Sequence, residues 1–279
     1  MGLKSFFHKI KIAFTRMHEP SIPNTSSAKK YGDFGEDEFV YAIRSELPEC
    51  KIKKNVIVQT AEGNAEIDCL ILYKNKLFAV EVKRWNGEII EDNNHFIQYK
   101  IDRWTKETHI KIHKSPFKQL NRAVYLLRKQ IPQNAWVNTV VFFEESDSIK
   151  INSDNVWFNI IDDLILHIVK HGKSSWSNNA KDFFEKSIAA DYLHSKSSIK
   201  KCIICDDSLK FNTAKGILTR KDIQTISIIH HWYYDELKIK TKNGDILFSK
   251  NENSSIIIID NGSKYRYSLS KLNHIQLSN

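Results

Sequence analysis

Residues 66–87 read EIDCLILYKNKLFAVEVKRWNG, and this stretch contains two apolar runs that decide the fold of the region. The first run spans residues 66–73 and the second spans residues 77–83, with only three residues between them. Two strand-like runs this close together predict an antiparallel hairpin. Because side chains alternate along a strand, Glu81 and Lys83 are expected to project from the same face of the second strand.

Three polar side chains interrupt the apolar pattern of this hairpin, namely Asp68, Glu81 and Lys83. If strand pairing brings Asp68 to the same end as the other two, two carboxylates and one ammonium group share a small volume. Neighbouring carboxylates repel each other unless a cation lies between them, and such oxygen ligands suit Mg²⁺ or Mn²⁺. The pattern therefore indicates metal-assisted phosphodiester hydrolysis. The alternative is a simple ion pair between Glu81 and Lys83 at the edge of a sheet.

Motifs on both sides of the hairpin occur in an order and spacing typical of a known family. They are YGDFGEDE at 31–38, NVIV at 55–58, EID at 66–68, VEVK at 80–83 followed by Gly87, and SPFKQ at 115–119. Together they resemble the nuclease-related domain family, usually called NERD, within the restriction-endonuclease-like PD-(D/E)XK superfamily. The resemblance extends from Tyr31 to about Ile168. Two positions depart from the family pattern: Ser115 replaces a common Asn and is an equally good helix cap, and Cys69 replaces a frequent His.

The resemblance implies a role for each residue that matches the central motif. Asp68 and Glu81 would bind the metal ion, with the main-chain carbonyl of Val82 as a third ligand. Lys83 would be the catalytic lysine, stabilising charge that develops on the phosphate or helping to take a proton from water. The implied cofactor is Mg²⁺ or Mn²⁺.

Two further residues are implied to face the same site from helices. Glu36, on the first helix, would be a metal ligand or would hold a water molecule, and Gln119 would approach from a later helix. The alternative for Glu36 is a glutamate in the first turn that is stabilised by the helix dipole. The alternative for Gln119 is a solvated helix residue.

A basic segment follows the central motif. Its cations are Lys100, Arg103, Lys106, Lys111, Lys114 and Lys118, and the aromatic residues among them are Tyr99, Trp104 and Phe117. Basic side chains interleaved with aromatic ones can follow a phosphate backbone, so this run predicts a nucleic-acid-binding surface. The alternative is a lysine-rich surface that only promotes solubility.

Composition agrees with a basic protein that binds a polyanion. The 279 residues include 42 Lys and Arg against 33 Asp and Glu, which leaves a net charge of +9. Such a charge suits nucleic acid or an anionic membrane surface. Four scattered cysteines exclude a disulfide scaffold, and no apolar stretch reaches membrane-spanning length. The default location is therefore the cytoplasm, with peripheral membrane attachment as an option.

The first sixteen residues form an amphipathic pattern. The apolar positions that share a helical stripe are Leu3, Phe6, Phe7, Ile10 and Phe14. Basic side chains occupy much of the remaining surface, which predicts a helix that binds an anionic membrane or a protein partner. Residues 20–28 are typical of a linker, so residues 1–28 are expected to form a leader. The alternative is that the stripe packs on the core of the protein.

The pattern after the leader predicts an α/β domain over residues 29–170. Helices are expected at 31–47, 116–130 and 162–170, and strands at 52–60, 66–73, 77–83, 136–143 and 156–161. These elements predict a restriction-endonuclease-like mixed central sheet flanked by helices. Residues 85–110 are a mixed segment in which Trp104 is expected to pack.

The C-terminal third has a different pattern. Residues 171–200 predict a polar connector with a helix at 180–194, and residues 201–279 predict a small antiparallel β domain. Its short strands are expected at 217–229, 237–242, 245–250, 255–260 and 264–269. Asn243-Gly244 and Asn261-Gly262 are strong two-residue hairpin signals. The β domain is compatible with binding a partner, binding nucleic acid or forming a homodimer.

One cysteine pair, Cys202 and Cys205, has the spacing of half a zinc site. A second Cys pair is absent from the sequence, and His230 and His231 do not have the spacing of a standard zinc finger. Two thiols in a strand-like run are the favoured interpretation, and Zn²⁺ is not expected here.

These observations predict a metal-dependent nuclease that acts on nucleic acid, with DNA favoured. The alternative, from a different class, is a catalytically silent protein with a nuclease-like fold that binds nucleic acid or another protein. A third possibility is an effector that the basic leader brings to a membrane surface. A role in antiviral defence is compatible with a nuclease of this kind.

Overall fold

The computed structural model describes residues 27–93, 95–102, 104–132, 135–172, 179–196, 198–213, 216–231, 234–251, 255–260 and 263–278. The stripe predicted within residues 1–16, Arg103 and the Asn261-Gly262 turn lie outside the described residues. The chain forms two compact units, with the boundary between Ile188 and Ala189. Among the described helices, none is long and apolar enough to cross a membrane.

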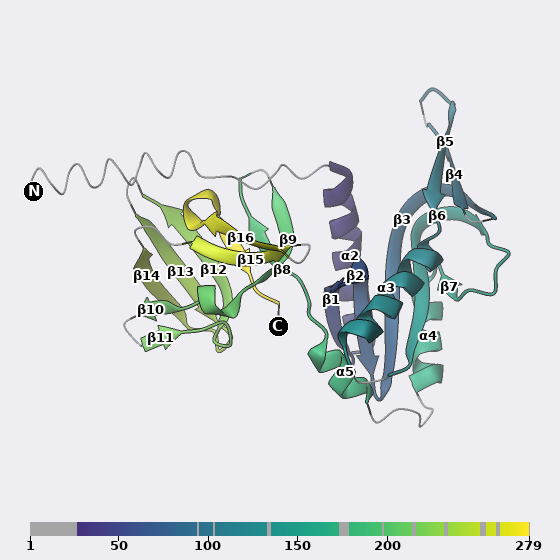
Figure 1. Cartoon of the computed structure of the whole chain (residues 1–279). Helices are drawn as coiled ribbons and strands as arrows, with labels where there is room; N and C mark the ends of the chain where they lie inside the picture. Colours follow the sequence, from purple (N-terminus) through teal and green to yellow (C-terminus); the bar gives the residue numbers. More distant parts are fainter. Residues whose placement is uncertain are drawn as a thin grey trace, which may run out of the picture. The chain divides into compact units, whose positions relative to one another are not determined.

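The first unit is built on a mixed sheet (Figure 1). Five strands follow one another as antiparallel neighbours: β1 (Lys51–Thr60), β2 (Gly63–Tyr73), β3 (Lys76–Asp92), β4 (His95–Ile101) and β5 (Thr108–Lys114). On the other edge of β3, strand β6 (Val137–Lys150) pairs in parallel, and β7 (Trp157–Phe158) pairs in parallel with β6. The predicted α/β class is confirmed at this level.

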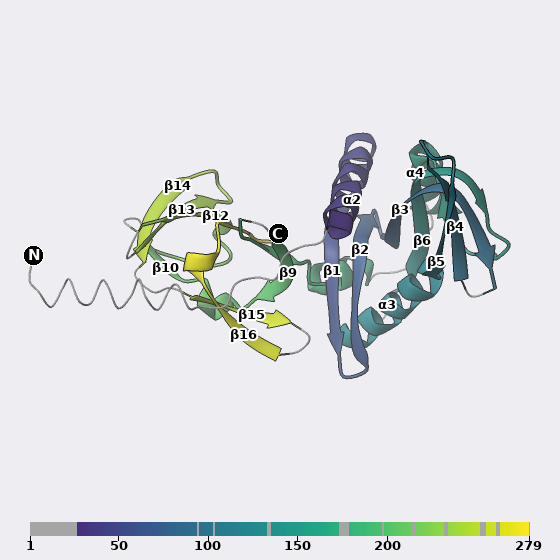
Figure 2. The same cartoon turned by 90° about the horizontal axis from the view of Figure 1, so that it is seen from above.

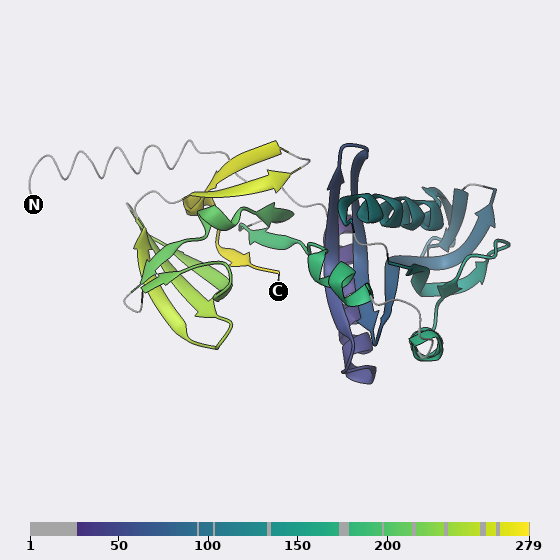
Figure 3. The same ribbon diagram turned by 60° about the horizontal axis from the view of Figure 1, so that its bottom comes forward.

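Helices cover both faces of the sheet, and Figures 2 and 3 show α2 and α3 on opposite sides of β1 and β2. Helix α3 (Pro116–Gln130) and helix α5 (Ala180–Lys186) contribute to one core, together with Leu70 and Leu72 of β2. Helix α2 (Ser27–Glu46) and helix α4 (Ile161–Gly172) contribute to the other, together with Ile71 and Tyr73. Because both faces are buried, β2 has a continuous apolar run instead of a polar–apolar alternation.

The predicted hairpin between β2 and β3 is confirmed. Cys69 lies opposite Val80, and Tyr73 lies opposite Lys76 across a short turn. Beyond Lys83, where the sequence predicted the strand to end, β3 continues to Asp92 through an irregularity between Arg84 and Glu88. Gly87 occupies this irregularity with φ of +87°, and a Cβ there would lie 2.2 Å from the carbonyl oxygen of Tyr99. Only glycine combines this backbone conformation with such a close approach.

The second unit contains an antiparallel eight-stranded sheet in the order β14-β13-β12-β17-β8-β9-β15-β16. The strands are β8 (Asp191–His194), β9 (Ile199–Ile204), β12 (Ile223–His230), β13 (Asp235–Thr241), β14 (Ile246–Asn251), β15 (Ser255–Asp260), β16 (Ser263–Ser268) and β17 (His274–Gln276). A separate hairpin joins β10 (Phe211–Thr213) and β11 (Gly216–Leu218). Gly244, with φ of +90°, lies in the turn between β13 and β14, as the Asn-Gly signal predicted.

Two expectations for irregular segments were wrong. The helix predicted at 180–194 ends at Lys186, and residues 191–194 form β8, because this segment pairs with both β9 and β17. Asp191 is fully buried in that strand and accepts hydrogen bonds from Arg220 and from the main chain of Ile204, which requires an extended backbone. Trp104 does not pack inside the domain, since it is 93% exposed.

Candidate active site

A fork in the sheet creates a cavity in the first unit. Strand β2 pairs with β3 up to the Cys69–Val80 pair, and β4 pairs with β3 only from the Glu88–Tyr99 pair onward. Residues 81–86 of β3 lie between these two hairpins and border a cavity of about 820 Å³. The cavity is therefore placed by strand topology, at the position where the neighbours of β3 diverge.

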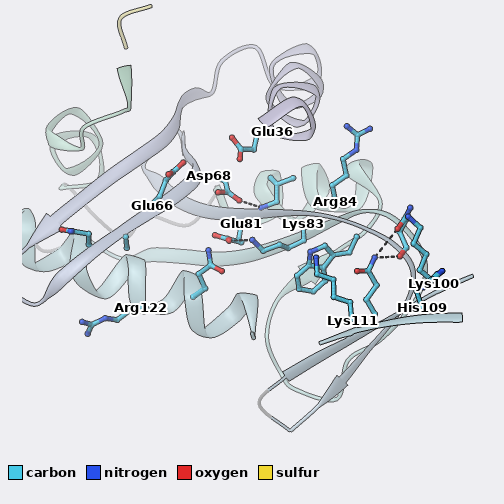
Figure 4. A pocket seen from close by; sticks show the side chains of 17 residues that line it. Glu36, Glu66, Asp68, Glu81, Lys83, Arg84, Lys100, His109, Lys111 and Arg122 are labelled. Carbon is cyan, nitrogen blue, oxygen red and sulfur yellow. Dashed lines mark hydrogen bonds and ion pairs between the residues drawn. The ribbon is translucent and has the colours of Figure 1, made fainter. Parts of the chain in front are cut away.

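Asp68 and Glu81 meet at the inner end of this cavity, as Figure 4 shows. One carboxylate oxygen of Asp68 accepts a hydrogen bond of 2.8 Å from the main-chain N–H of Val82. Glu81 is fully buried, and its Oε1 accepts a 2.5 Å hydrogen bond from Nζ of Lys83. Its other oxygen, Oε2, is buried without a hydrogen-bond partner. The structure therefore brings Asp68, Glu81 and Lys83 together, as the sequence predicted.

Burial and nearby negative charge raise the pKa of both carboxyl groups. Burial, followed by the charge of Glu81, raises the pKa of Asp68 to about 7. Burial also raises the pKa of Glu81, against the opposing effect of Lys83. A site that holds two carboxylates at such cost favours a cation between them.

Lys83 is the cation already present in this corner. Burial acts to lower its pKa, but the charges of Glu81 and Asp68 outweigh that effect and raise the pKa above its ordinary value. Lys83 is therefore a protonated ammonium group in this arrangement. In that form it can stabilise negative charge that develops on a phosphate.

Two helices bring the other predicted residues to the same cavity. Glu36 of α2 lies in the cavity wall, is only 8% exposed, and has Nζ of Lys54 3.8 Å from its Oε2. Gln119 of α3 lies in the wall as well, with an exposed side chain. Helix α3 begins where the sequence predicted, because the hydroxyl of Ser115 accepts a hydrogen bond from the main-chain N–H of Lys118 and Pro116 occupies the first turn.

The role of Arg84, which follows Lys83 in β3, was not predicted from the sequence. Its guanidinium group contacts Glu38 of α2 at 3.1 Å, Glu144 of β6 at 3.5 Å and Glu145 of β6 at 2.6 Å. Gly35 of α2 lies close to this ion-pair cluster, since a Cβ there would be 2.8 Å from Oε2 of Glu144. Arg84 thus ties α2 to β3 and β6, and thereby holds Glu36 over the site.

A polar network at the fork was also absent from the sequence-based predictions. The imidazole of His113 stacks on Trp85 with a centroid distance of 4.1 Å, and its Nε2 lies 3.0 Å from Oε1 of Gln98. The side-chain amide of Gln98 donates a 2.7 Å hydrogen bond to the main-chain carbonyl of Asn86. Burial lowers the pKa of His113 to about 4, so this imidazole is neutral near pH 7. The network joins β4 and β5 to the irregular part of β3.

The predicted nucleic-acid-binding lysines divide into two groups. Lys100 and Lys111 line the cavity, on the side opposite the carboxylates, together with His109 (Figure 4). Lys114 is exposed on β5 but lies an odd number of positions from Lys111, so it projects from the other face of the hairpin. Lys118 is exposed on α3, outside the cavity wall.

A cation of α3 completes the basic side of the cavity. Arg122 lines the cavity three positions after Gln119, which places both residues on one face of the helix. The helical spacing of Gln119 and Arg122 was a usable signal in the sequence. By contrast, Phe117 is buried in the core and is not available to nucleic acid.

The side chains of the site supply only some of the ligands that a hard divalent cation needs. Within the described ranges, no three His, Cys, Asp or Glu side chains are grouped closely enough to hold a metal ion. Mg²⁺ is usually bound by one or two carboxylates together with water and substrate phosphate. Asp68 and Glu81, with the unpartnered Oε2 of Glu81, match that smaller requirement.

The cysteine pair of the second unit lies in another setting. Cys202 is buried within the core of that unit, and burial raises the pKa of its thiol far above the usual range. Cys205 is partly exposed at the end of β9. His230 contacts Asp235 at 2.8 Å, and His231 stacks on Tyr234, so both imidazoles have other neighbours.

The fold and the site together define an α/β protein with a carboxylate–lysine cavity at a fork in its sheet. The family model of the nuclease-related domain matches residues 31–144. This match confirms the resemblance seen in the motifs over residues 31–144, and the general placement of the NERD family is the PD-(D/E)XK superfamily. No curated protein and no solved structure shows a significant match to the chain.

Proposed function

We propose that this protein is a metal-dependent nuclease that hydrolyses phosphodiester bonds in nucleic acid, with DNA as the favoured substrate. The observation that carries the proposal is the buried pair of Asp68 and Glu81, with an unpartnered carboxylate oxygen on Glu81 and Lys83 beside it. A structural ion pair would not need the second carboxylate. The match to the nuclease-related domain supports the same chemistry.

In the proposal, Asp68, Glu81 and the carbonyl of Val82 hold Mg²⁺ or Mn²⁺. When bound, the ion would polarise the scissile phosphate and lower the pKa of a water molecule. The residues present fit such an ion because a cation would offset the burial and the charge of Glu81 that together raise the pKa of Asp68. Carboxylate and carbonyl oxygens are also the ligands that these ions prefer.

The protein side chains supply positioning and charge. Lys83 stabilises the negative charge that develops on the phosphate oxygens, a role that matches its raised pKa. Glu36, held near Lys54, and Gln119 orient water at the cavity wall. Lys100, Lys111 and Arg122 are expected to bind phosphates next to the scissile one.

The charges that line the cavity also explain why a metal ion would be needed. Five cationic residues and four anionic residues line it: Lys83, Arg84, Lys100, Lys111 and Arg122 against Glu36, Glu66, Asp68 and Glu81. This near balance gives a polyanion little reason to approach the carboxylates. A divalent cation between Asp68 and Glu81 would make the inner end of the cavity attractive to phosphate.

Two broader proposals accompany the chemical one. The central mixed sheet with helices on both faces supports a restriction-endonuclease-like arrangement for residues 27–188. The four cysteines are free thiols, which supports a reducing compartment such as the cytoplasm.

The test is incubation of the purified protein with plasmid, linear duplex DNA, single-stranded DNA and RNA, each with Mg²⁺, Mn²⁺ or EDTA. Cleavage of at least one DNA substrate with metal, and none with EDTA, is the expected result. Binding without cleavage under every metal condition would instead support the catalytically silent alternative.

A further inference from the structure

The tip of the β4–β5 hairpin presents an aromatic side chain to solvent. Trp104 is 93% exposed, although it is one of the largest apolar residues. Oδ1 of Asp102 accepts hydrogen bonds of 2.8 Å from the main-chain N–H groups of both Trp104 and Thr105. Lys106 adopts φ of +60° and donates its N–H to the carbonyl of Asp102. Tryptophan is enriched among the residues that contribute most to binding, so this exposed ring is a candidate contact.

Trp104 lines a second cavity of about 950 Å³ that adjoins the active-site cavity. The two cavities share Asn86 and Lys100, at the place where β4 leaves β3. Tyr99 and Ile101 flank Lys100 and project from the opposite face of the hairpin, and both line the second cavity. A strand bound at the active site would therefore pass Lys100 to reach Trp104.

The charges of the second cavity suit bases better than phosphates. Among the residues that the structure describes, its wall contains four carboxylates, Glu88, Asp102, Glu145 and Asp147, and one cation, Lys100. Negative side chains repel phosphate, but they accept hydrogen bonds from the amino groups of bases. Lys111 lines only the first cavity, and Lys100 lies where the two cavities meet.

We propose that Trp104 stacks on a nucleobase of an unpaired strand that leaves the active site past Lys100. Bases of a duplex are stacked and paired inside it, so only an unpaired strand can turn a base toward Trp104 while its phosphates contact Lys100 and Lys111. The substrate class is thus nucleic acid with a single-stranded segment. This inference rests on the proposed nuclease function, because it takes the active-site cavity as the place of phosphate binding.

The test measures binding of a fluorescent single-stranded dT oligonucleotide and of a duplex of equal length to the full-length chain in EDTA. The variants are Trp104→Ala, Trp104→Phe and the control Trp136→Ala. Trp136 is also exposed, at 67%, and lies next to Arg128, with a distance of 5.7 Å from the guanidinium carbon to the ring centroid, outside both cavities. Since Trp104 has almost no buried surface, its substitution does not threaten the fold.

Trp104→Ala should weaken single-strand binding by roughly 10-fold or more, in line with the loss of one base–aromatic stack. Duplex binding should change little, Trp104→Phe should retain most of the affinity, and Trp136→Ala should match the parent protein. Quenching of tryptophan fluorescence by the oligonucleotide should decrease in Trp104→Phe.

Two results would overturn the inference: equal affinity of Trp104→Ala and the parent for the single strand, or equal losses for single strand and duplex. The outcome is separable from that of the nuclease proposal. A Trp104-dependent preference for single strands in a protein that cleaves nothing would support the stacking contact and contradict hydrolysis. Metal-dependent cleavage, together with no effect of Trp104→Ala on binding, would support hydrolysis and contradict the stacking contact.

Discussion

Two hairpins border the candidate site, and they differ in almost every physical respect. The β2–β3 hairpin is covered on both faces, and it supplies Asp68, Glu81 and Lys83. The β4–β5 hairpin is largely exposed along β5, with Ile110 and Ile112 each more than 60% exposed, and it supplies Lys100 and Lys111. A buried hairpin can hold two carboxylates close together despite their repulsion. An exposed hairpin instead places its cations where water solvates them.

The difference separates two tasks. Chemistry that depends on strained charge requires a buried scaffold, because only strong packing offsets the repulsion between Asp68 and Glu81. Attraction of a polyanion needs neither burial nor strain. Substitutions in the first hairpin should therefore affect turnover, and substitutions in the second should affect affinity.

The largest effect is expected from Asp68→Asn. This change keeps the shape of the side chain and removes one metal ligand, so cleavage should fall by roughly 10³-fold or more, since a bound metal contributes several kcal/mol to charge stabilisation. Single-turnover cleavage at saturating protein measures it. Oligonucleotide binding in EDTA should remain close to wild type. A variant that loses binding and cleavage together would contradict the division of tasks.

Removal of Arg84, which ties α2 and β6 to β3, should cost stability as well as activity. Arg84→Gln leaves Glu38, Glu144 and Glu145 without their shared cation, in a region where the Arg84 side chain is only 13% exposed. Loss of a buried pairing of this kind costs about 3 kcal/mol. Urea unfolding should show the loss, whereas the matched control Lys150→Gln, whose own side chain is 65% exposed, should change the stability little. Equal stabilities for Arg84→Gln and the wild type would refute the role of Arg84 as a tie.

A smaller effect is expected on the basic hairpin. Lys111→Glu should weaken DNA binding about 10-fold at low salt and flatten the salt dependence, because each phosphate contact contributes about 0.7–0.9 to the slope. Lys114→Glu, on the opposite face of β5, should have the smaller effect of the two. Affinity measured over a range of salt concentrations provides the comparison. If both variants behave alike, only the overall charge of the hairpin matters.

The smallest effect concerns metal and pH. Mn²⁺ should raise the melting temperature by a few degrees through binding to the folded state. Without metal, the pKa of Asp68 is about 7 when folded against 3.8 as the ordinary value, so the folded state holds the proton more tightly and this site becomes less stabilising as the pH rises toward 7. Metal competes with that proton, and its stabilising effect should therefore be larger at pH 8 than at pH 6. An equal shift at both values would indicate binding elsewhere.

The same contrast explains how much the sequence could predict. The β2–β3 hairpin, the start of α3 at Ser115 and Pro116, and the convergence of Asp68 with Glu81 follow from local patterns, because burial imposes apolar runs and a helix cap imposes residue types. The β4–β5 hairpin was not predicted, since its exposed strands carry no clear alternation and its connection is not a two-residue turn.

The contacts of Arg84 lay beyond prediction for another reason. Its partners Glu38 and Glu145 come from α2 and β6, and only the tertiary arrangement brings them together. The same holds for the placement of Lys100 and Lys114 on different faces, which depends on where β4 and β5 begin. Long-range packing, and not local propensity, decides both.

The most direct test of the central claim is cleavage by purified Lys83→Ala protein with Mg²⁺ and Mn²⁺, beside wild type and EDTA controls. Lys83 is the charge that the two carboxylates surround, and its removal leaves the sheet and both hairpins otherwise intact. We expect a cooperative melting transition, oligonucleotide binding near the wild-type value and no detectable cleavage. Undiminished, EDTA-sensitive cleavage by this variant would show that the active site lies elsewhere.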